Sequence, residues 1–344
     1  MPLWPSLFAL ARPIRGALRQ GALAFFRSTA AATATIFDVY FAYRLLADRE
    51  PTPGELAQWQ VEVDGGRVSR AALVDRLTGP ARAGETVLDL GGYVMSVDAD
   101  DPMIGRSLAL TRQLEPNVTT EFRRWITPDS AVLDIGANMG WFTLLAAHLA
   151  PHGHVIAVEA HPGNVRLIET SVAANAFAHV DIWPVAAVEQ TGLVDFATAN
   201  SNGYIPKAGR PVESIIRRVP GVALDALLAD VARLDVVKID IEGFEPYALR
   251  GMRTALERWR PVIFCEFHPW IMRVREPDLA DRYLQFLRDL GYRLDLITRD
   301  TGVLADQTDG QIWDHWRVVN AQMGSADGIH HLDLLARPAA RLQP

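Results

Sequence analysis

Cysteine is almost absent from this sequence of 344 residues, because Cys265 is the only one. An internal disulfide is therefore excluded, and the chain suits a reducing compartment, so we expect a cytoplasmic location. Cys265 lies within the apolar run from Val262 to Phe267, which favours a buried structural thiol over a reactive one.

Positive charge is also scarce. The sequence holds 34 lysine and arginine residues against 41 aspartate and glutamate residues, and its formal net charge is -7. Because phosphate recognition normally needs a basic surface, we do not expect nucleic acid as a partner. Hydrophobic residues make up 49% of the chain, a proportion that argues against extensive disorder. The length suits one large α/β domain with a smaller N-terminal element.

Acidic residues are missing from the first 37 positions, where arginines carry all the charge. Apolar residues such as Trp4, Phe8 and Leu18 recur there at three- and four-residue spacing, which predicts a helix with one apolar face. The arginines interrupt any stretch long enough for a conventional transmembrane span, and the pattern does not match a secretory signal. Residues 1–37 are interpreted as a basic amphipathic leader, which either contacts the inner membrane face peripherally, packs on the rest of the protein or is poorly ordered.

Residues 38–80 are expected to form a small helical module. Its apolar residues have helical spacing, and prolines and the turn Asp64-Gly65-Gly66 separate the expected helices. The module resembles one found in bacterial proteins linked to surface glycans, on the pattern of residues 43–46 (YRLL), 49–51 (REP) and 56–59 (LAQW). Its aromatic residues are interpreted as core rather than as a ligand site.

Strand and helix patterns alternate from residue 130 onward. A β-hairpin is expected before them, over residues 86–98, and Glu115-Pro116 marks a helix start. This alternation predicts βαβ units and a mainly parallel sheet covered on both faces, which binds ligands at the carboxyl ends of its strands. Strands are expected over 132–135, 155–158, 180–183, 236–241 and 262–267, and helices over 141–150, 165–176 and 248–259.

A glycine-containing turn follows the first of these strands. Gly136 and Gly140 permit tight turning of the backbone and close approach of a ligand. Glu159 ends the next strand, where a carboxylate can accept hydrogen bonds from both hydroxyls of a ribose. Asn138 stands where a dinucleotide-binding turn has a glycine, and Asp134 adds negative charge. This favours S-adenosylmethionine, which carries a sulfonium and an ammonium. A nucleotide-dependent Rossmann oxidoreductase or sugar-modifying enzyme stays as the alternative.

A second motif, from Lys238 to Pro246, crowds the carboxylates of Asp240, Glu242 and Glu245 at the end of another buried strand. Like charges repel, so such crowding favours a functional task over a solvated loop.

Together these residues resemble the FkbM-type methyltransferase family over roughly residues 93–337. The resemblance implies a class I, Rossmann-like α/β fold with a mostly parallel seven-stranded sheet, a domain over 85–340 and a cofactor core over 130–270. It also implies S-adenosylmethionine-dependent O-methylation of a hydroxyl, with a sugar in a glycan, glycolipid or secondary metabolite as the expected acceptor. A non-catalytic scaffold is the alternative from another class. The matching stretches are 132–145 (VLDIGANMGWFTLL), 155–164 (VIAVEAHPGN), 185–188 (VAAV), 237–245 (VKIDIEGFE) and 262–269 (VIFCEFHP).

The same resemblance assigns cofactor contacts. Gly136, Asn138 and Gly140 are expected to line the methionine and ribose portions, Glu159 to hold the ribose, and Val185 with Ala186 to pass near the adenine.

O-methylation needs a group that receives the hydroxyl proton. Asp240 is the first candidate for that base or for orienting the acceptor, with Glu242 and His268 as further candidates. Glu266 is expected in a salt bridge, with Lys238 as the suggested partner. The pair His330-His331 lacks a partner at ligand spacing and is rejected as a metal site. Carboxylates can hold Mg²⁺, but the sequence alone decides neither a metal nor the oligomeric state.

Overall fold

The computed structural model describes residues 39, 59–60, 62–66, 68, 84–207, 215–298, 302–325 and 327–339. The predicted leader, 1–37, lies outside the described residues, as does most of the predicted helical module, 38–80. Within that module, residues 59–60 and 62–64 are helical and a turn follows at Gly65-Gly66, as the sequence predicts. No helix in the described ranges combines the length and the apolar character needed to cross a membrane.

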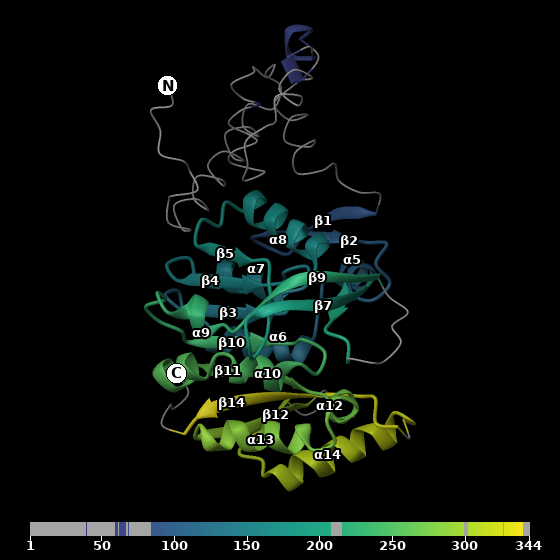
Figure 1. Cartoon of the computed structure of the whole chain (residues 1–344), viewed down its shortest axis with the longest axis vertical. Helices are drawn as coiled ribbons and strands as arrows, with labels where there is room; N and C mark the ends of the chain where they lie inside the picture. Colours follow the sequence, from purple (N-terminus) through teal and green to yellow (C-terminus); the bar gives the residue numbers. More distant parts are fainter. Residues whose placement is uncertain are drawn as a thin grey trace.

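An eight-stranded sheet forms the centre of the fold, in the order β13-β12-β14-β11-β10-β3-β4-β5 (Figure 1). The five strands from β5 to β11 in that order are parallel, and β14 pairs antiparallel with both β11 and β12. The predicted Rossmann-like sheet is confirmed, with an added eighth strand, β13, which forms an antiparallel edge hairpin with β12. The strands are β3 (Ala131–Ile135), β4 (His154–Val158), β5 (Val180–Trp183), β10 (Val236–Ile239), β11 (Val262–Phe267), β12 (Tyr292–Thr298), β13 (Gly302–Leu304) and β14 (Leu332–Pro338).

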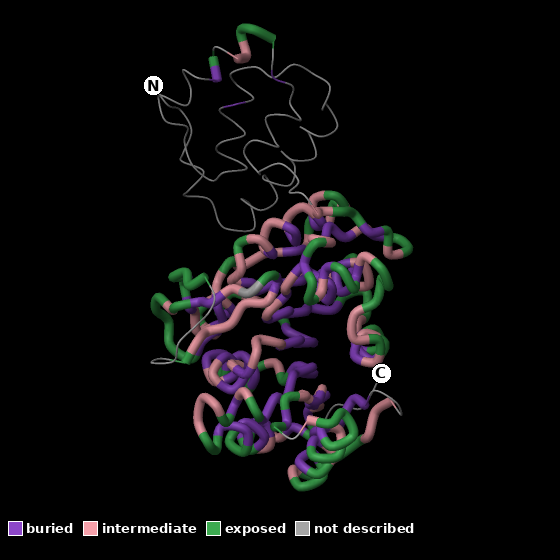
Figure 2. The backbone as a smooth tube through the Cα atoms, turned by 90° about the vertical axis from the view of Figure 1, so that its right-hand side faces the viewer, coloured by how far each residue is buried: buried purple, intermediate pink, exposed green. Residues whose placement is uncertain are grey.

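Alternation along these strands divides the apolar residues between the two faces of the sheet. On β3 and β10, Leu133 and Val237 belong to one buried cluster, whereas Val132 and Val236 belong to the other. Both faces are therefore covered, which explains why the central strands are continuous apolar runs. Figure 2 shows buried segments of the backbone, in purple, running through the middle of the domain. Cys265 lies within this core, and burial raises the pKa of its thiol to about 12, as expected for a structural thiol.

The covering helices contribute to separate clusters. Helices α6 and α7 contribute to the cluster of Val132, and α10, α11, α13 and α14 to that of Leu133. The predicted helix over 248–259 is two helices, which are separated at Gly251 and Met252. Gly251 packs closely on Val188, because a Cβ at this glycine would lie 2.0 Å from the carbonyl oxygen of Val188. The helices are α5 (Gly105–Thr111), α6 (Pro116–Trp125), α7 (Trp141–Leu149), α8 (Pro162–Ala174), α9 (Asp225–Leu228), α10 (Glu245–Arg250), α11 (Arg253–Trp259), α12 (Pro269–Arg275), α13 (Leu279–Asp289) and α14 (Asp309–Gln322).

Two smaller sheets accompany the central one. The predicted hairpin is confirmed as β1 (Glu85–Asp89) and β2 (Val94–Asp98), which pair antiparallel. A four-stranded sheet, in the order β6-β9-β7-β8, was not expected from the sequence. It consists of β6 (Ala186–Ala187), β7 (Gly192–Ala199), β8 (Asn202–Tyr204) and β9 (Ile215–Val222), and its β7–β8 turn extends toward the carboxyl ends of the central strands.

Candidate functional site

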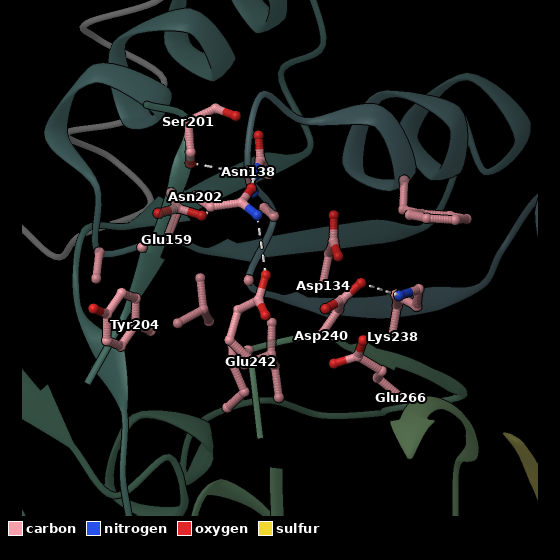
Figure 3. Close-up of a pocket in the computed structure, with 18 of the residues that line it drawn as sticks. Asp134, Asn138, Glu159, Ser201, Asn202, Tyr204, Lys238, Asp240, Glu242 and Glu266 are labelled. Carbon is pink, nitrogen blue, oxygen red and sulfur yellow. Dashed lines mark hydrogen bonds and ion pairs between the residues drawn. The ribbon is translucent and has the colours of Figure 1, made fainter. Parts of the chain in front are cut away.

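A cavity of about 310 Å³ lies at the carboxyl ends of β3, β4, β10 and β11 (Figure 3). The structure brings nearly all of the predicted site residues to its wall, although they come from separate parts of the chain. These are Asp134, Gly136, Asn138, Glu159, Val185, Ala186, Asp240, Glu242 and His268.

Gly140 is the predicted cofactor residue that does not line this cavity. It precedes α7 with a φ of 98°, and a Cβ there would lie 3.1 Å from the side chain of Ile168 on α8. The absence of a side chain at Gly140 therefore permits the turn and lets α7 pack closely against α8.

The loop after β3 packs directly on the end of β10. Gly136 has a φ of 80°, and a Cβ at this position would lie 1.9 Å from the carbonyl oxygen of Asp240. A side chain at this position would collide with that oxygen, so glycine is required where the loop lines the cavity. Asp134, two residues earlier on β3, is buried and accepts a hydrogen bond from Thr143 Oγ1 at 2.6 Å. Burial raises the pKa of Asp134 to about 6.

Glu159 links the loops after β3 and β4. Its Oε2 accepts a hydrogen bond from the main-chain N–H of Asn138 at 2.8 Å, and its Oε1 accepts one from the N–H of His161 at 2.6 Å. These bonds fix the plane of the carboxylate while lone pairs remain for a ligand. The side chain is buried, which raises its pKa to about 7.

Lys238 is the buried cation of the site. Its Nζ donates a hydrogen bond to Asp240 Oδ2 at 3.2 Å and lies 3.8 Å from Glu115 Oε2. Burial alone would lower the pKa of Lys238, but these carboxylates raise it above its ordinary value. Burial opposes ionisation of Asp240 in turn, yet the charge of Lys238 holds its pKa below the usual range. Asp240 is therefore an ion-paired carboxylate and a weak proton acceptor.

The suggested partner of Glu266 was wrong. Glu266 Oε1 accepts a hydrogen bond from Nδ1 of His331 at 2.9 Å, because β14 lies antiparallel beside β11 and brings His331 to that point. Burial lowers the pKa of His331, but the hydrogen bond to Glu266 outweighs it and raises the pKa to about 10. His331 is thus a cation at the cavity wall and a partner of Glu266.

Glu242 and His268 differ in environment. Glu242 has a φ of 57°, a left-handed conformation that is unusual for this residue type, and its Oε1 accepts a hydrogen bond from Asn202 Nδ2 at 3.1 Å. Burial, together with the charges of Asp240 and Glu245, raises the pKa of Glu242 to about 7. Burial and the charge of His331 lower the pKa of His268 to about 4, so its imidazole is neutral.

The sequence analysis missed the contribution of the β7–β8 turn. Ser201, Asn202 and Tyr204 line the cavity, and Asp101 holds the turn by accepting hydrogen bonds from the N–H and Oγ of Ser201, both at 2.9 Å. The sequence Asn-Ser-Asn-Gly over 200–203 is typical of a turn and could have indicated this one. Glu115, noted only as a helix start, also lines the cavity.

The strand order, the glycine turn and the acidic residue after β4 define a class I methyltransferase fold. Residues 134–294 match the family model described as "Methyltransferase FkbM domain". The chain therefore carries an FkbM methyltransferase domain and is an S-adenosylmethionine-dependent methyltransferase, which confirms the predicted family and cofactor. This match favours the methyltransferase over the alternative oxidoreductase.

Several solved structures are similar to this chain. A methyltransferase FkbM from Methylobacillus flagellatus KT is 15% identical, with 71% of this chain and 68% of that chain covered and a TM-score of 0.36. A precorrin-6y C5,15-methyltransferase from Geobacter metallireducens GS-15 is 15% identical, with 71% and 94% covered and a TM-score of 0.37. An O-methyltransferase from Bacillus cereus in complex with SAH is 14% identical, with 66% and 83% covered and a TM-score of 0.37. No curated protein matches the sequence.

The residues present suit this cofactor. The bare backbone at Gly136 gives room for close approach, and Glu159 offers lone pairs of an oriented carboxylate to hydroxyl groups. Asp134 and Asp240 place negative charge beside the glycine loop, which stabilises a ligand with cationic groups.

Proposed function

We propose that this chain methylates a hydroxyl group of a sugar, in a glycan, a glycolipid or a secondary metabolite. The observation that carries the proposal is the lining of the cavity outside the cofactor loop. This lining includes carboxylate and amide groups, from Glu115, Glu242 and Asn202, and the aromatic side chains of Trp141 and Tyr204. Such a wall offers hydrogen bonds to hydroxyl groups and apolar faces to a sugar ring.

Charge favours a neutral acceptor over a phosphorylated one. Among the described lining residues, the basic ones are Lys238, His268 and His331. Lys238 is committed to Asp240 and Glu115, His331 is bonded to Glu266, and His268 is neutral. An anionic acceptor would therefore face surplus carboxylates that repel it.

A neighbouring cavity extends the room for an acceptor. It has a volume of about 380 Å³ and shares Leu114 and Trp141 with the first cavity. Gln113, Thr119 and Thr120 lie along it, and their side chains can bond hydroxyl groups. An acceptor of more than one sugar unit fits this arrangement, with the reacting hydroxyl in the first cavity.

The cofactor supplies a methyl group on a cationic sulfur. The acceptor hydroxyl must lose its proton as the oxygen–carbon bond forms, and Glu242 is the residue proposed to receive it. Its carboxylate lies at the cavity wall, is oriented by Asn202, and is not held by a cation as Asp240 is. Asp240, fixed by Lys238, is then a group that orients the acceptor hydroxyl rather than the base.

Methyl transfer to defined acceptors tests this function. The full chain, incubated with methyl-labelled S-adenosylmethionine, is expected to label neutral glycosides and glycolipid extracts and to release S-adenosylhomocysteine in equal amount. A matched set of sugar phosphates and amines serves as the comparison. Preferred labelling of the phosphates or amines would contradict the proposed acceptor class. Cofactor binding without transfer to any of these pools would favour a scaffold.

A further inference from the structure

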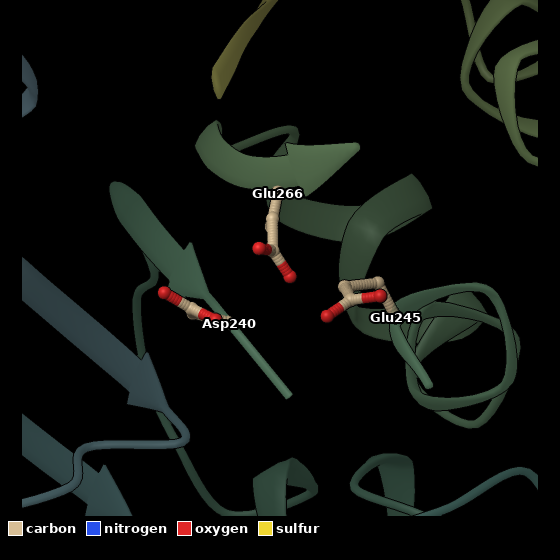
Figure 4. Close-up of side chains that lie close together, drawn as sticks. All are labelled: Asp240, Glu245 and Glu266. Carbon is tan, nitrogen blue, oxygen red and sulfur yellow. The ribbon is translucent and has the colours of Figure 1, made fainter. Parts of the chain in front are cut away.

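Three carboxylates converge beside the cofactor loop, from separate elements. Asp240 follows β10, Glu245 begins α10, and Glu266 lies on β11. One oxygen from each lies within 4.8 Å of the other two, and Figure 4 shows the three side chains directed toward a common point.

Each carboxylate is held through one of its oxygens. Lys238 donates to Asp240 Oδ2, and His331 donates to Glu266 Oε1. Glu245 Oε1 accepts hydrogen bonds from the main-chain N–H groups of Ile241 at 2.8 Å and Gly243 at 3.3 Å. Donors of this kind behind a carboxylate fix its orientation, as they do around protein metal sites.

The second oxygens of two of these groups are buried and unpaired. Glu245 is fully buried and Glu266 is 5% exposed, and Oε2 of each has no hydrogen-bond partner within the described part of the chain. A buried carboxylate oxygen without a partner is costly, and two of them close together add mutual repulsion. A cation between them removes both penalties.

We propose that Asp240, Glu245 and Glu266 bind one divalent cation, either Mg²⁺ or Mn²⁺. The ligands are all hard oxygens, and three negative charges favour a divalent ion over a monovalent one. Oxygen atoms bind Mg²⁺ at about 2.0–2.1 Å, so small side-chain movements bring three oxygens this close onto one ion.

The site is open on one side. Asp240 and Glu266 also line the cavity at the carboxyl ends of the strands, whereas Glu245 does not, so the ion would sit in the cavity wall with its remaining positions toward the interior. If the acceptor is a sugar, as the proposed function holds, neighbouring hydroxyl oxygens can occupy those positions. The cation would then orient the acceptor.

Binding of Mn²⁺ to the full chain tests this proposal without an activity assay. After chelator treatment, titration followed by electron paramagnetic resonance is expected to show one saturable site per chain. Mg²⁺ is expected to displace the Mn²⁺. The Glu245→Gln and Glu266→Gln variants are expected to bind Mn²⁺ at least about tenfold more weakly. Glu257→Gln, at an exposed position on α11, is the matched control and should bind as the unmodified chain does.

Thermal unfolding followed by circular dichroism shows which variants are folded. Should a glutamine variant fail that check, Asp240→Asn, at a partly exposed position, takes its place and should also weaken Mn²⁺ binding. No saturable Mn²⁺ site in the unmodified chain, or unchanged affinity in folded variants, overturns the proposal. If the chain methylates sugars in the presence of a chelator, the proposed function is retained and only the proposed role of the cation is contradicted.

Discussion

Glu159 accepts a hydrogen bond from the main-chain N–H of Asn138, with 2.8 Å between the nitrogen and Oε2. This bond joins the residue that follows β4 to the glycine loop that follows β3. Asn138 has a φ of 50°, so the loop holds an unusual backbone conformation at the point of contact. The same carboxylate can therefore shape the loop and bind the ligand.

Glu159→Gln is expected to weaken the binding of S-adenosylhomocysteine by about 10- to 100-fold, because hydrogen bonds to a charged group contribute roughly 1.5–3 kcal/mol. Glutamine keeps the size of the side chain but loses the charge and one acceptor. Isothermal titration calorimetry measures the affinity, with Glu257→Gln as control. Equal affinity of the two variants for S-adenosylhomocysteine would show that Glu159 does not bind the cofactor.

Gly136→Ala is expected to destabilise the fold by about 2 kcal/mol or more, because strain at such a backbone position costs roughly 1–3 kcal/mol. The added Cβ would also meet the carbonyl oxygen of Asp240 at 1.9 Å. Gly192→Ala is the matched control, since a Cβ there has nothing within 4 Å. Urea unfolding compares the two variants, and a similar midpoint for both would refute the close packing.

Glu242→Gln is expected to lower the turnover number by about 100-fold or more, the usual contribution of a positioned proton acceptor. Binding of S-adenosylhomocysteine should change little, because glutamine retains the oxygen that accepts from Asn202. Single-turnover methyl transfer and calorimetry separate the two effects. Normal turnover in this variant would assign the proton to another group, with His268 the next to substitute.

Asp101→Asn is expected to cost about 2 kcal/mol of stability at pH 7, because the carboxylate accepts hydrogen bonds from the N–H groups of Ile104, Gly105 and Ser201. Burial would raise the pKa of Asp101, but these bonds lower it below its ordinary value of 3.8. Its contribution is thus present above about pH 4 and is lost as the pH falls through the lowered pKa.

Urea unfolding from pH 7 downward measures the free-energy difference between Asp101→Asn and the unmodified chain. That difference should stay constant to about pH 4 and shrink below it. A difference that grows toward acid would show that the sign is wrong.

The part of the site that binds the cofactor was predictable, because the sequence patterns that encode it are local. A buried strand, a glycine turn and a helix follow one another without interruption, and Glu159 ends the next strand of the same pattern. Contiguous hydrophobic runs and turn residues determine such units almost independently of the rest of the chain.

The rest of the cavity wall, where the acceptor is proposed to bind, was less predictable. β9 is mostly exposed and contains Pro220, so it shows little of the alternation that reveals a strand. The turn with Ser201 and Asn202 is held at the cavity by residues far away in sequence: Asp101, which is 100 positions away from Ser201, and Glu242, which accepts from Asn202. The pairing of Glu266 with His331 likewise depends on β14, which inserts between β11 and β12.

By itself the sequence determined the class of fold, the cofactor loop and the acidic motif after β10, because each is encoded by residues adjacent along the chain. Only the tertiary structure decided which charges meet: Lys238 with Asp240 and Glu115, His331 with Glu266, and Glu245 with Asp240 and Glu266. Partner choice among buried charges follows from distances between strands, and strand order joins segments far apart in sequence.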